Sequence, residues 1–129
     1  MTDLSVVYQS QRGHTKSLAE AIVTGVKQVP GVSAELFEIS GRNVREGRFE
    51  DSKLMSHLDE TDGIIFGCAT YMGSGSAIFK AFLEAAFQPH WLEQRWKDKI
   101  AAGFTNSASQ NGDKLSTLIN WLHLRCRWA

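Results

Sequence analysis

The stretch Gly63-Ile64-Ile65-Phe66-Gly67-Cys68 indicates the fold more clearly than any other part of the chain. Its apolar side chains follow one another without the polar alternation of a strand that faces water on one side. A continuous apolar run of this length, bounded by glycines, is typical of a strand buried on both faces of a parallel sheet. The run therefore predicts a central strand with covering layers on both of its faces.

Three further strands are predicted from shorter runs of apolar residues, at Leu4–Tyr8, Ser33–Ile39 and Ile100–Phe104. Each predicted strand is followed by a segment with helical periodicity, in which apolar residues recur every three or four positions. In the first of these segments they are Leu18, Ala19, Ile22, Val26 and Val29. Four alternating strands and helices predict the α/β class, with a parallel sheet covered by helices on both faces. The length of 129 residues predicts a single domain over residues 1–129.

The balance of charges excludes several classes of protein. The chain has 14 lysines and arginines against 14 aspartates and glutamates, so its formal net charge is zero. A dedicated nucleic-acid-binding protein usually carries a basic excess that neutralises phosphates, so we expect no nucleic-acid partner. The apolar fraction of 43% and the charged fraction of 22% exclude a disordered, collagen-like or coiled-coil chain.

The cysteines and the first residues bear on the cellular compartment. Cys68 and Cys126 are too few for a disulfide framework and lack the spacing of metal ligands. Met1–Leu4 carries neither a positive region nor an apolar region of a signal peptide, and no apolar run approaches the roughly 20 residues that span a bilayer. We therefore expect a cytoplasmic protein without a metal site or a membrane span, in which Cys68 is a small buried hydrophobe.

Loops rich in Ser, Thr, Asn and Gly follow three of the four predicted strands, at residues 10–15, 70–76 and 105–112. Open α/β sheets bind ligands outside the carboxyl ends of their strands. The three loops therefore predict one shared binding site. The alternative is that the loops are merely solvated connections.

The first loop, Ser10-Gln11-Arg12-Gly13-His14-Thr15, has the composition of a phosphate-binding turn. A helix N-terminus offers free N–H groups and a partial positive charge, so it can hold a phosphate without a lysine. The hydroxyls of Ser10 and Thr15 add donors, and Gly13 lets the backbone approach a ligand closely. A tight turn in which Thr15 caps the helix is the alternative interpretation.

Better-known phosphate sites and two related active sites do not match. The lysine-containing loop of the P-loop proteins is absent. Gly73 and Gly75 supply two glycines of the dinucleotide-binding fingerprint, but Ile78 stands where the third belongs. A receiver domain needs an aspartate where Cys68 stands, and a low-molecular-weight phosphatase needs an arginine where Ser74 stands.

The second and third loops offer flat apolar surface and many hydrogen-bond donors. Both are needed by an isoalloxazine ring, whose faces are apolar and whose carbonyls accept hydrogen bonds. The loops therefore favour a flavin as the ligand.

Three motifs, in this order and over residues 4–124, carry a resemblance to a known family. They are Ser10-x-x-Gly13-His14-Thr15 after Val6-Val7-Tyr8, then Gly67-x-x-Thr70-Tyr71-Met72-Gly73, then Lys99-Ile100-Ala101-Ala102-Gly103-Phe104-Thr105-Asn106-Ser107. With them the chain resembles the flavodoxin-like superfamily. Within it, the chain is most similar to the NAD(P)H:quinone oxidoreductases of the Trp-repressor-binding-protein type and to flavodoxin-family FMN reductases. The resemblance implies a flavodoxin-like three-layer sandwich with sheet order 2-1-3-4, its strands numbered along the chain.

The same resemblance implies a role for each loop. The FMN phosphate would be held by Ser10, Gln11, Arg12, Gly13, His14 and Thr15, and the nicotinamide cofactor would lie near Arg12. The flavin ring would be flanked by Thr70, Tyr71, Met72 and Gly73. Its polar edge would be contacted by Asn106, Ser107, Ala108, Ser109, Gln110 and Asn111. The position of Trp91 matches an aromatic residue that faces the substrate over the flavin.

The chain departs from that family after its fourth predicted helix. Family members continue into a fifth strand and helix, and this chain stops about one such unit short. The strand at Ile100–Phe104 is then expected to be an unpaired edge, beside apolar residues of the last helix at Leu118, Trp121 and Leu122. We therefore expect a homo-oligomer that covers this edge, most simply a two-fold dimer.

The function that the resemblance implies is FMN-dependent oxidoreduction, with hydride passing from NAD(P)H through the flavin to a quinone-like acceptor. The flavin supplies the chemistry, so we expect no side-chain nucleophile and no essential acid–base pair. One alternative is a flavodoxin-type electron carrier, although such carriers are usually strongly acidic. The other is a flavodoxin-like binding module that no longer holds FMN.

Overall fold

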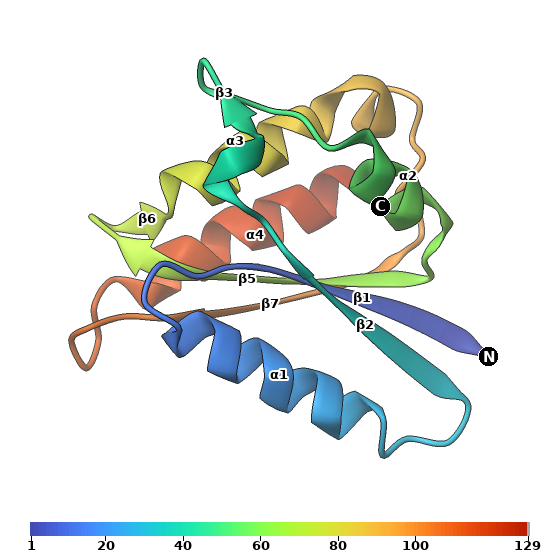
Figure 1. Ribbon diagram of the computed structural model, residues 1–129, viewed down its shortest axis with the longest axis horizontal. Coiled ribbons are helices and arrows are strands. Elements are labelled where there is room, and N and C mark those ends of the chain that lie inside the picture. The colour runs from blue at the N-terminus through green and yellow to red at the C-terminus, as the bar shows by residue number, and fades with distance from the viewer. Residues whose placement is uncertain (129) are drawn as a thin grey trace.

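A mostly parallel sheet forms the centre of the protein (Figure 1). The computed structural model describes the backbone of residues 1–128 and the side chains of residues 1–123, so the side chain of Cys126 lies outside the described part. The four long strands are β1 (Thr2–Gln9), β2 (Val32–Glu38), β5 (Gly63–Tyr71) and β7 (Ile100–Asn106). β1 pairs in parallel with β2 and with β5, and β5 pairs in parallel with β7. The order β2-β1-β5-β7 confirms the predicted order 2-1-3-4 of these four strands.

Helices cover both faces of the sheet, which confirms the predicted three layers. Figure 1 shows α1 (His14–Val26) on one face, with α3 (Ala77–Ala85) and α4 (Lys114–Trp128) on the other. Residues of α2 (Ser52–Glu60) are buried in the same core as those of α3 and α4. No helix within the described residues is long and apolar enough to cross a membrane.

The two faces of the sheet bury different kinds of side chain. Between α1 and its face of the sheet, the buried residues are small or aliphatic with one tyrosine: Val6, Tyr8, Ala19, Val23 and Ala34. Phe104 packs against them and is partly buried. The opposite face is aromatic. The ring centroid of Phe79 lies 6.3 Å from that of Phe66, 5.5 Å from that of Phe82 and 5.9 Å from that of Trp121. These rings join β5, α3 and α4, and each such pair adds about 0.5–1.5 kcal/mol beyond the burial of its area.

Two strands run further into the polar loops than predicted. β5 continues through Thr70 and Tyr71, and β7 continues to Asn106. Thr70 pairs with Gly75 and Tyr71 with Ser74, so β5 turns back into the short antiparallel strand β6 (Ser74–Gly75). The predicted strands end before the polar residues that follow Cys68 and Phe104. Threonine and tyrosine nevertheless favour a strand conformation when a neighbouring strand pairs with them.

A second small hairpin was not predicted. It lies between β2 and α2 and follows the short helical turn η1 (Gly41–Asn43). Its strands are β3 (Val44–Arg45) and β4 (Arg48–Phe49), and Phe49 is buried in the aromatic core. The sequence pattern of residues 41–50 is that of a polar loop, because only two of its side chains, those of Val44 and Phe49, are large and apolar.

β7 lies at one edge of the sheet. Among the described strands it pairs only with β5. Ile100 is 58% exposed, and the neighbouring helix α4 exposes Leu118 at 39% and Leu122 at 52%. A hollow of about 190 Å³ lies between β7 and α4, and its lining includes Ala102 and Trp121.

The segment between α3 and β7 is fixed to α2 by Asp59. The two carboxylate oxygens accept hydrogen bonds from His90 Nδ1 at 2.6 Å, from Trp96 Nε1 at 2.7 Å and from Arg95 at 3.0 Å. Lys99 Nζ donates to the backbone carbonyls of Asp59 and Thr61. Burial alone would raise the pKa of Asp59, but the hydrogen bonds from His90, Trp96 and Arg95 outweigh it and hold that pKa below its ordinary value.

Candidate functional site

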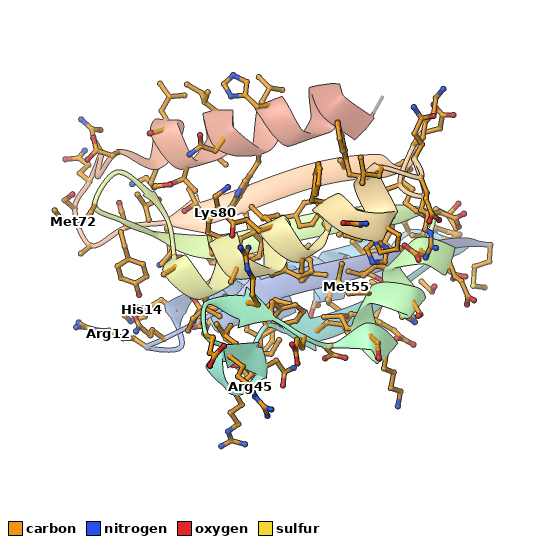
Figure 2. All side chains as sticks on the ribbon, turned by 90° about the horizontal axis from the view of Figure 1, so that it is seen from above. Arg12, His14, Arg45, Met55, Met72 and Lys80 are labelled. Atoms are coloured by element: carbon orange, nitrogen blue, oxygen red, sulfur yellow. The ribbon has the colours of Figure 1, made fainter. Side chains whose placement is uncertain are left out.

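The three polar loops lie together at one edge of the sheet. β1, β5 and β7 run parallel, so their carboxyl ends meet at the same edge. Figure 1 shows the loops that follow these ends together at the left of the view. In Figure 2, Arg12, His14 and Met72 lie at that same end. The predicted site residues of the three loops are therefore brought to the edge where open α/β sheets bind their ligands.

The first loop ends in a helix N-terminus that no side chain caps. Gly13 is the N-cap residue of α1, with φ of 95°, and no side chain bonds to the first-turn N–H groups. Ser10 Oγ instead accepts a hydrogen bond from Gly13 N at 3.0 Å, which closes the loop on itself. A side chain at Gly13 would meet no heavy atom within 4 Å, so the space beside this backbone is open. First-turn N–H groups have no partner within their own helix, so they remain available to a ligand here.

Thr15 does not cap the helix. Its side chain is buried, and Thr15 Oγ1 donates to Asn106 Oδ1 at 2.7 Å. This bond joins the first turn of α1 to the end of β7. The capping alternative from the sequence is therefore wrong, and the hydroxyl links the first loop to the third.

A chain of threonine hydroxyls joins the second loop to the third. Thr105 Oγ1 donates to the carbonyl oxygen of Cys68 at 2.7 Å. Because that hydrogen is already used, the contact of 2.8 Å between Thr70 and Thr105 has Thr70 as its donor. By the same reasoning Thr117 donates to Thr70 at 2.9 Å. The ends of β5 and β7 and the second turn of α4 are thus held in one directed chain.

The second loop is a tight turn that exposes apolar side chains. Met72 and Gly73 have φ of 50° and 81°, the left-handed values of a two-residue hairpin turn of type I′. Met72 is fully exposed, and Tyr71 is 39% exposed. These two side chains supply the flat apolar surface that the sequence predicted here.

The third loop is organised by a lysine that sequence reasoning missed. Lys114 Nζ donates to Ser107 Oγ at 3.0 Å and to the carbonyl oxygen of Gln110 at 2.6 Å, with a longer contact of 3.4 Å to that of Ser109. Ser107 Oγ itself donates to the Ser109 carbonyl at 2.7 Å. Lys114 and Thr117 lie three residues apart, so they share one face of α4. If one of the two residues is predicted to contact the loops, this spacing predicts that the other does so as well.

Cys68 lies at the end of β5, beneath the second loop. It is fully buried, and burial raises the pKa of its thiol to about 11. The side chain is therefore a neutral thiol at physiological pH. This agrees with its interpretation as a small buried hydrophobe, since only the thiolate is a strong nucleophile.

A sequence profile of a known family covers almost the entire chain. The profile, described as NADPH-dependent FMN reductase, matches residues 5–124. The chain belongs to this family.

Individual relatives of this FMN reductase family member carry two kinds of name. One is "Flavodoxin FldP" of Pseudomonas aeruginosa (strain UCBPP-PA14), which is 41% identical over 120 residues. Another is "NAD(P)H dehydrogenase (quinone)" of Geobacter sulfurreducens, which is 34% identical over 129 residues. The matches cover 92% and 90% of this chain, but only 58% and 63% of those two proteins. The chain thus spans about three-fifths of the length of the curated relatives that it matches.

Solved structures support the same family and the fold. A flavodoxin, WrbA-like protein from Agrobacterium tumefaciens superposes with a TM-score of 0.84 and 41% identity, over 99% of this chain and 74% of that one. A flavodoxin from the domain Archaea superposes with a TM-score of 0.72 at 20% identity, over 99% of this chain and 76% of that one. The second likeness shows the fold alone. The two together confirm the flavodoxin-like architecture.

In this FMN reductase family member, Trp91 lies at the other end of the sheet from the three loops. It belongs to η2 (Phe87–Trp91), a single π-helical turn after α3, and its ring stacks on Phe87 with centroids 5.3 Å apart. The adjacent His90 is bonded to Asp59, near the C-terminus of α2 and the amino end of β5. α3 runs from the carboxyl edge of the sheet toward the opposite edge, and Trp91 lies just after the end of this helix. Within this chain, Trp91 therefore does not lie beside the three loops.

Proposed function

We propose that the protein binds FMN in the three loops and passes a hydride from NAD(P)H through the flavin to a quinone-like acceptor. The observation that carries the proposal is the bond between Thr15 and Asn106, which fixes the first and third loops together at the carboxyl edge. Membership of the FMN reductase family supports the cofactor. The relatives named NAD(P)H dehydrogenase (quinone) support the donor and the class of acceptor.

The first loop is suited to the phosphate of FMN. The uncapped N–H groups of the first turn of α1 are donors, and the helix adds a partial positive charge at this end. The open space beside Gly13 leaves room for the phosphate to approach the backbone. Ser10, Gln11 and His14 complete this loop, and exposed Arg12 provides a cation for a nicotinamide cofactor.

The second and third loops are suited to the ring. Thr70, Tyr71, Met72 and Gly73 form a turn whose exposed apolar side chains can lie against a flat ligand. Residues 106–111 begin at the end of β7, at the same edge, and their amide and hydroxyl side chains are of the kind that can bond the polar edge of the ring. Bound FMN would supply the hydride chemistry, and the described residues would bind it, orient it and limit access of water.

No side-chain nucleophile or acid–base pair is part of the proposal. The buried thiol of Cys68 is neutral, and the hydroxyls of Thr70, Thr105 and Thr117 are bonded to one another. The role of the chain is therefore binding and positioning.

We also propose a homo-oligomer in the cytoplasm. Among the described strands β7 pairs only with β5, so its other side offers N–H and C=O groups beside the exposed Leu118 and Leu122 of α4. A two-fold dimer would pair these edges and bury that surface. A second copy is also the means by which Trp91 could reach the substrate side of a flavin bound in its partner.

The second candidate is a flavodoxin-type electron carrier. The name of the relative from Pseudomonas aeruginosa favours it. The zero net charge does not, because carriers that dock on basic partners are usually acidic.

Three measurements test the proposal. The absorption spectrum of the purified protein, and titration of the colourless protein with FMN, decide whether the loops hold a flavin. Steady-state oxidation of NAD(P)H with a soluble quinone then separates an oxidoreductase from a carrier. A protein that binds no FMN would overturn the proposal and leave a binding module. A protein that binds FMN but turns over no NAD(P)H would favour the carrier.

A further inference from the structure

The third loop encloses an ammonium group. Lys114, in the first turn of α4, directs Nζ into the loop, where the Ser107 hydroxyl and the carbonyl oxygens of Ser109 and Gln110 surround it. A side chain at Gly112 would place its Cβ 2.2 Å from Ser107 Oγ, so only glycine lets the loop close around the lysine. The ammonium has three N–H groups, and the loop provides one oxygen for each of them.

The described side chains form no ion pair with this ammonium. Among the described side chains, the carboxylates found in ion pairs are Glu35, Asp59, Glu84 and Glu93, and none of these pairs includes Lys114. The oxygens that surround Lys114 Nζ are neutral. The N-terminus of α4 adds a partial positive charge in the same place. Lys114 Nζ therefore brings a positive charge inside the third loop, at the carboxyl edge of the sheet, while the carboxylate of the adjacent Asp113 belongs to an exposed residue.

We propose that Lys114 is a positioning residue that shapes the third loop and also favours negative charge on the ligand that this loop contacts. The inference rests on the proposed function, in which that ligand is FMN. Reduction of a flavin by a hydride from NAD(P)H adds one negative charge to it. A positive charge at its polar edge stabilises the reduced form more than the oxidised form. Lys114 thus sets the affinity for reduced FMN, whereas the hydrogen bonds of the loop serve both forms.

The positioning role is tested on the ligand-free protein by amide hydrogen exchange over residues 107–112. Lys114→Met removes the three hydrogen bonds, whereas Lys114→Arg keeps the charge and the N–H donors. The control is Lys27→Met, which replaces an exposed lysine at the C-terminal end of α1, away from the loops. We expect exchange about tenfold faster in Lys114→Met and within about threefold of the wild type in the other two. Unchanged exchange in Lys114→Met would overturn the positioning role, whether or not the protein binds FMN.

The electrostatic role is tested by titration of the same variants with oxidised and with reduced FMN. We expect Lys114→Met to lose about tenfold more affinity for the reduced form than for the oxidised form, a difference of roughly 30 mV in the two-electron potential. Lys114→Arg should keep the wild-type ratio of the two affinities. Equal losses for both forms in Lys114→Met would overturn the electrostatic role. A wild-type protein that binds neither form would overturn the proposed function and this role with it, while the exchange experiment still decides the positioning role.

Discussion

Thr15 Oγ1 donates a hydrogen bond of 2.7 Å to Asn106 Oδ1, between residues that lie 91 positions apart in the chain. Thr15 belongs to the first turn of α1 and Asn106 is the last residue of β7. The bond spans from the loop proposed to hold a phosphate to the loop proposed to hold the ring. The two loops are thus set relative to each other before a ligand arrives, which lowers the ordering cost of binding.

Replacement of Thr15 tests this link. Thr15→Val keeps the shape of the side chain but removes the donor, so we expect a loss of about 1 kcal/mol in the free energy of unfolding and weaker FMN binding. Thr15→Ser keeps the hydroxyl and should retain most of the stability and most of the affinity for FMN. Urea unfolding and FMN titration measure the two effects. Equal behaviour of the valine and serine variants would contradict the proposed role of the bond.

Replacement of Gly13 tests the phosphate site. At φ of 95° a β-branched side chain is strained, so Gly13→Val should distort the loop at a cost of about 1–2 kcal/mol. We expect a much larger loss of affinity for FMN than for riboflavin, which lacks the phosphate. Gly25→Ala, at an exposed glycine near the end of the same helix, is the control. Equal losses for the two ligands would show that the phosphate is not held by this loop.

Replacement of Trp91 tests whether a second copy completes the site. With flavin-loaded protein, Trp91→Ala should change the kinetic parameters for the quinone or for NAD(P)H by about threefold or more and leave FMN affinity nearly unchanged. Leu92→Ala is the control, because Leu92 is exposed in the same segment. Kinetics that do not change would assign Trp91 a purely structural role in its stack with Phe87.

A charge on the open edge strand tests the oligomer. Ala102 is exposed on β7, and Ala102→Lys should prevent pairing of two such edges, since edge lysines oppose strand addition. Light scattering should give a dimer for the wild type and a monomer for the variant. A wild-type protein that is monomeric at micromolar concentration would rule the proposed oligomer out.

The hydrogen bonds of Asp59 predict a dependence of stability on pH. Its pKa is lower in the folded state than the ordinary 3.8, so the folded protein gains stability above that pH and loses it as the pH falls below 3.8. At neutral pH, Asp59→Asn should lower the free energy of unfolding by about 1–3 kcal/mol, because it weakens the bonds to Arg95, His90 and Trp96. The difference between wild type and variant should shrink in acid. Asp98→Asn replaces an exposed aspartate of the same segment and should show no such trend.

The sheet and its ligand-binding edge could be predicted because their signals are local. The apolar run of residues 63–68 indicates a buried strand without knowledge of the strands that pair with it. The loops that follow parallel strands lie at the same edge because the strands run in the same direction. The ends of β5 and β7 were misplaced because the polarity of Thr70 and Thr105 hid their pairing. Their hydroxyls satisfy one another across the two strands, which removes the usual penalty for burying them.

The contacts that organise the site could not be predicted from the sequence. The bond from Thr15 to Asn106 depends on which of several nearby donors and acceptors meet in three dimensions. The closure of the third loop around Lys114 depends on the path of its backbone, and a lysine at the start of a helix ordinarily reaches into solvent. The place of Trp91 at the opposite edge could not be predicted for a different reason. The family resemblance gives it a role beside the substrate but does not say which copy of the chain holds that substrate, so this role stays a prediction.

The directed chain from Thr117 through Thr70 and Thr105 to the Cys68 carbonyl also limits where protons can come from. Thr117 donates its hydroxyl hydrogen to Thr70 and Thr70 donates to Thr105. Thr105 donates to the Cys68 carbonyl oxygen, which has no proton to pass on. These hydroxyls therefore form a closed scaffold beneath the ring site and not a proton wire. If the protein reduces a quinone by hydride transfer, the one proton that completes the hydroquinone would come from a source outside this chain of hydroxyls. The rate of quinone reduction should then be insensitive to the loss of any one of the three hydroxyls as an acid.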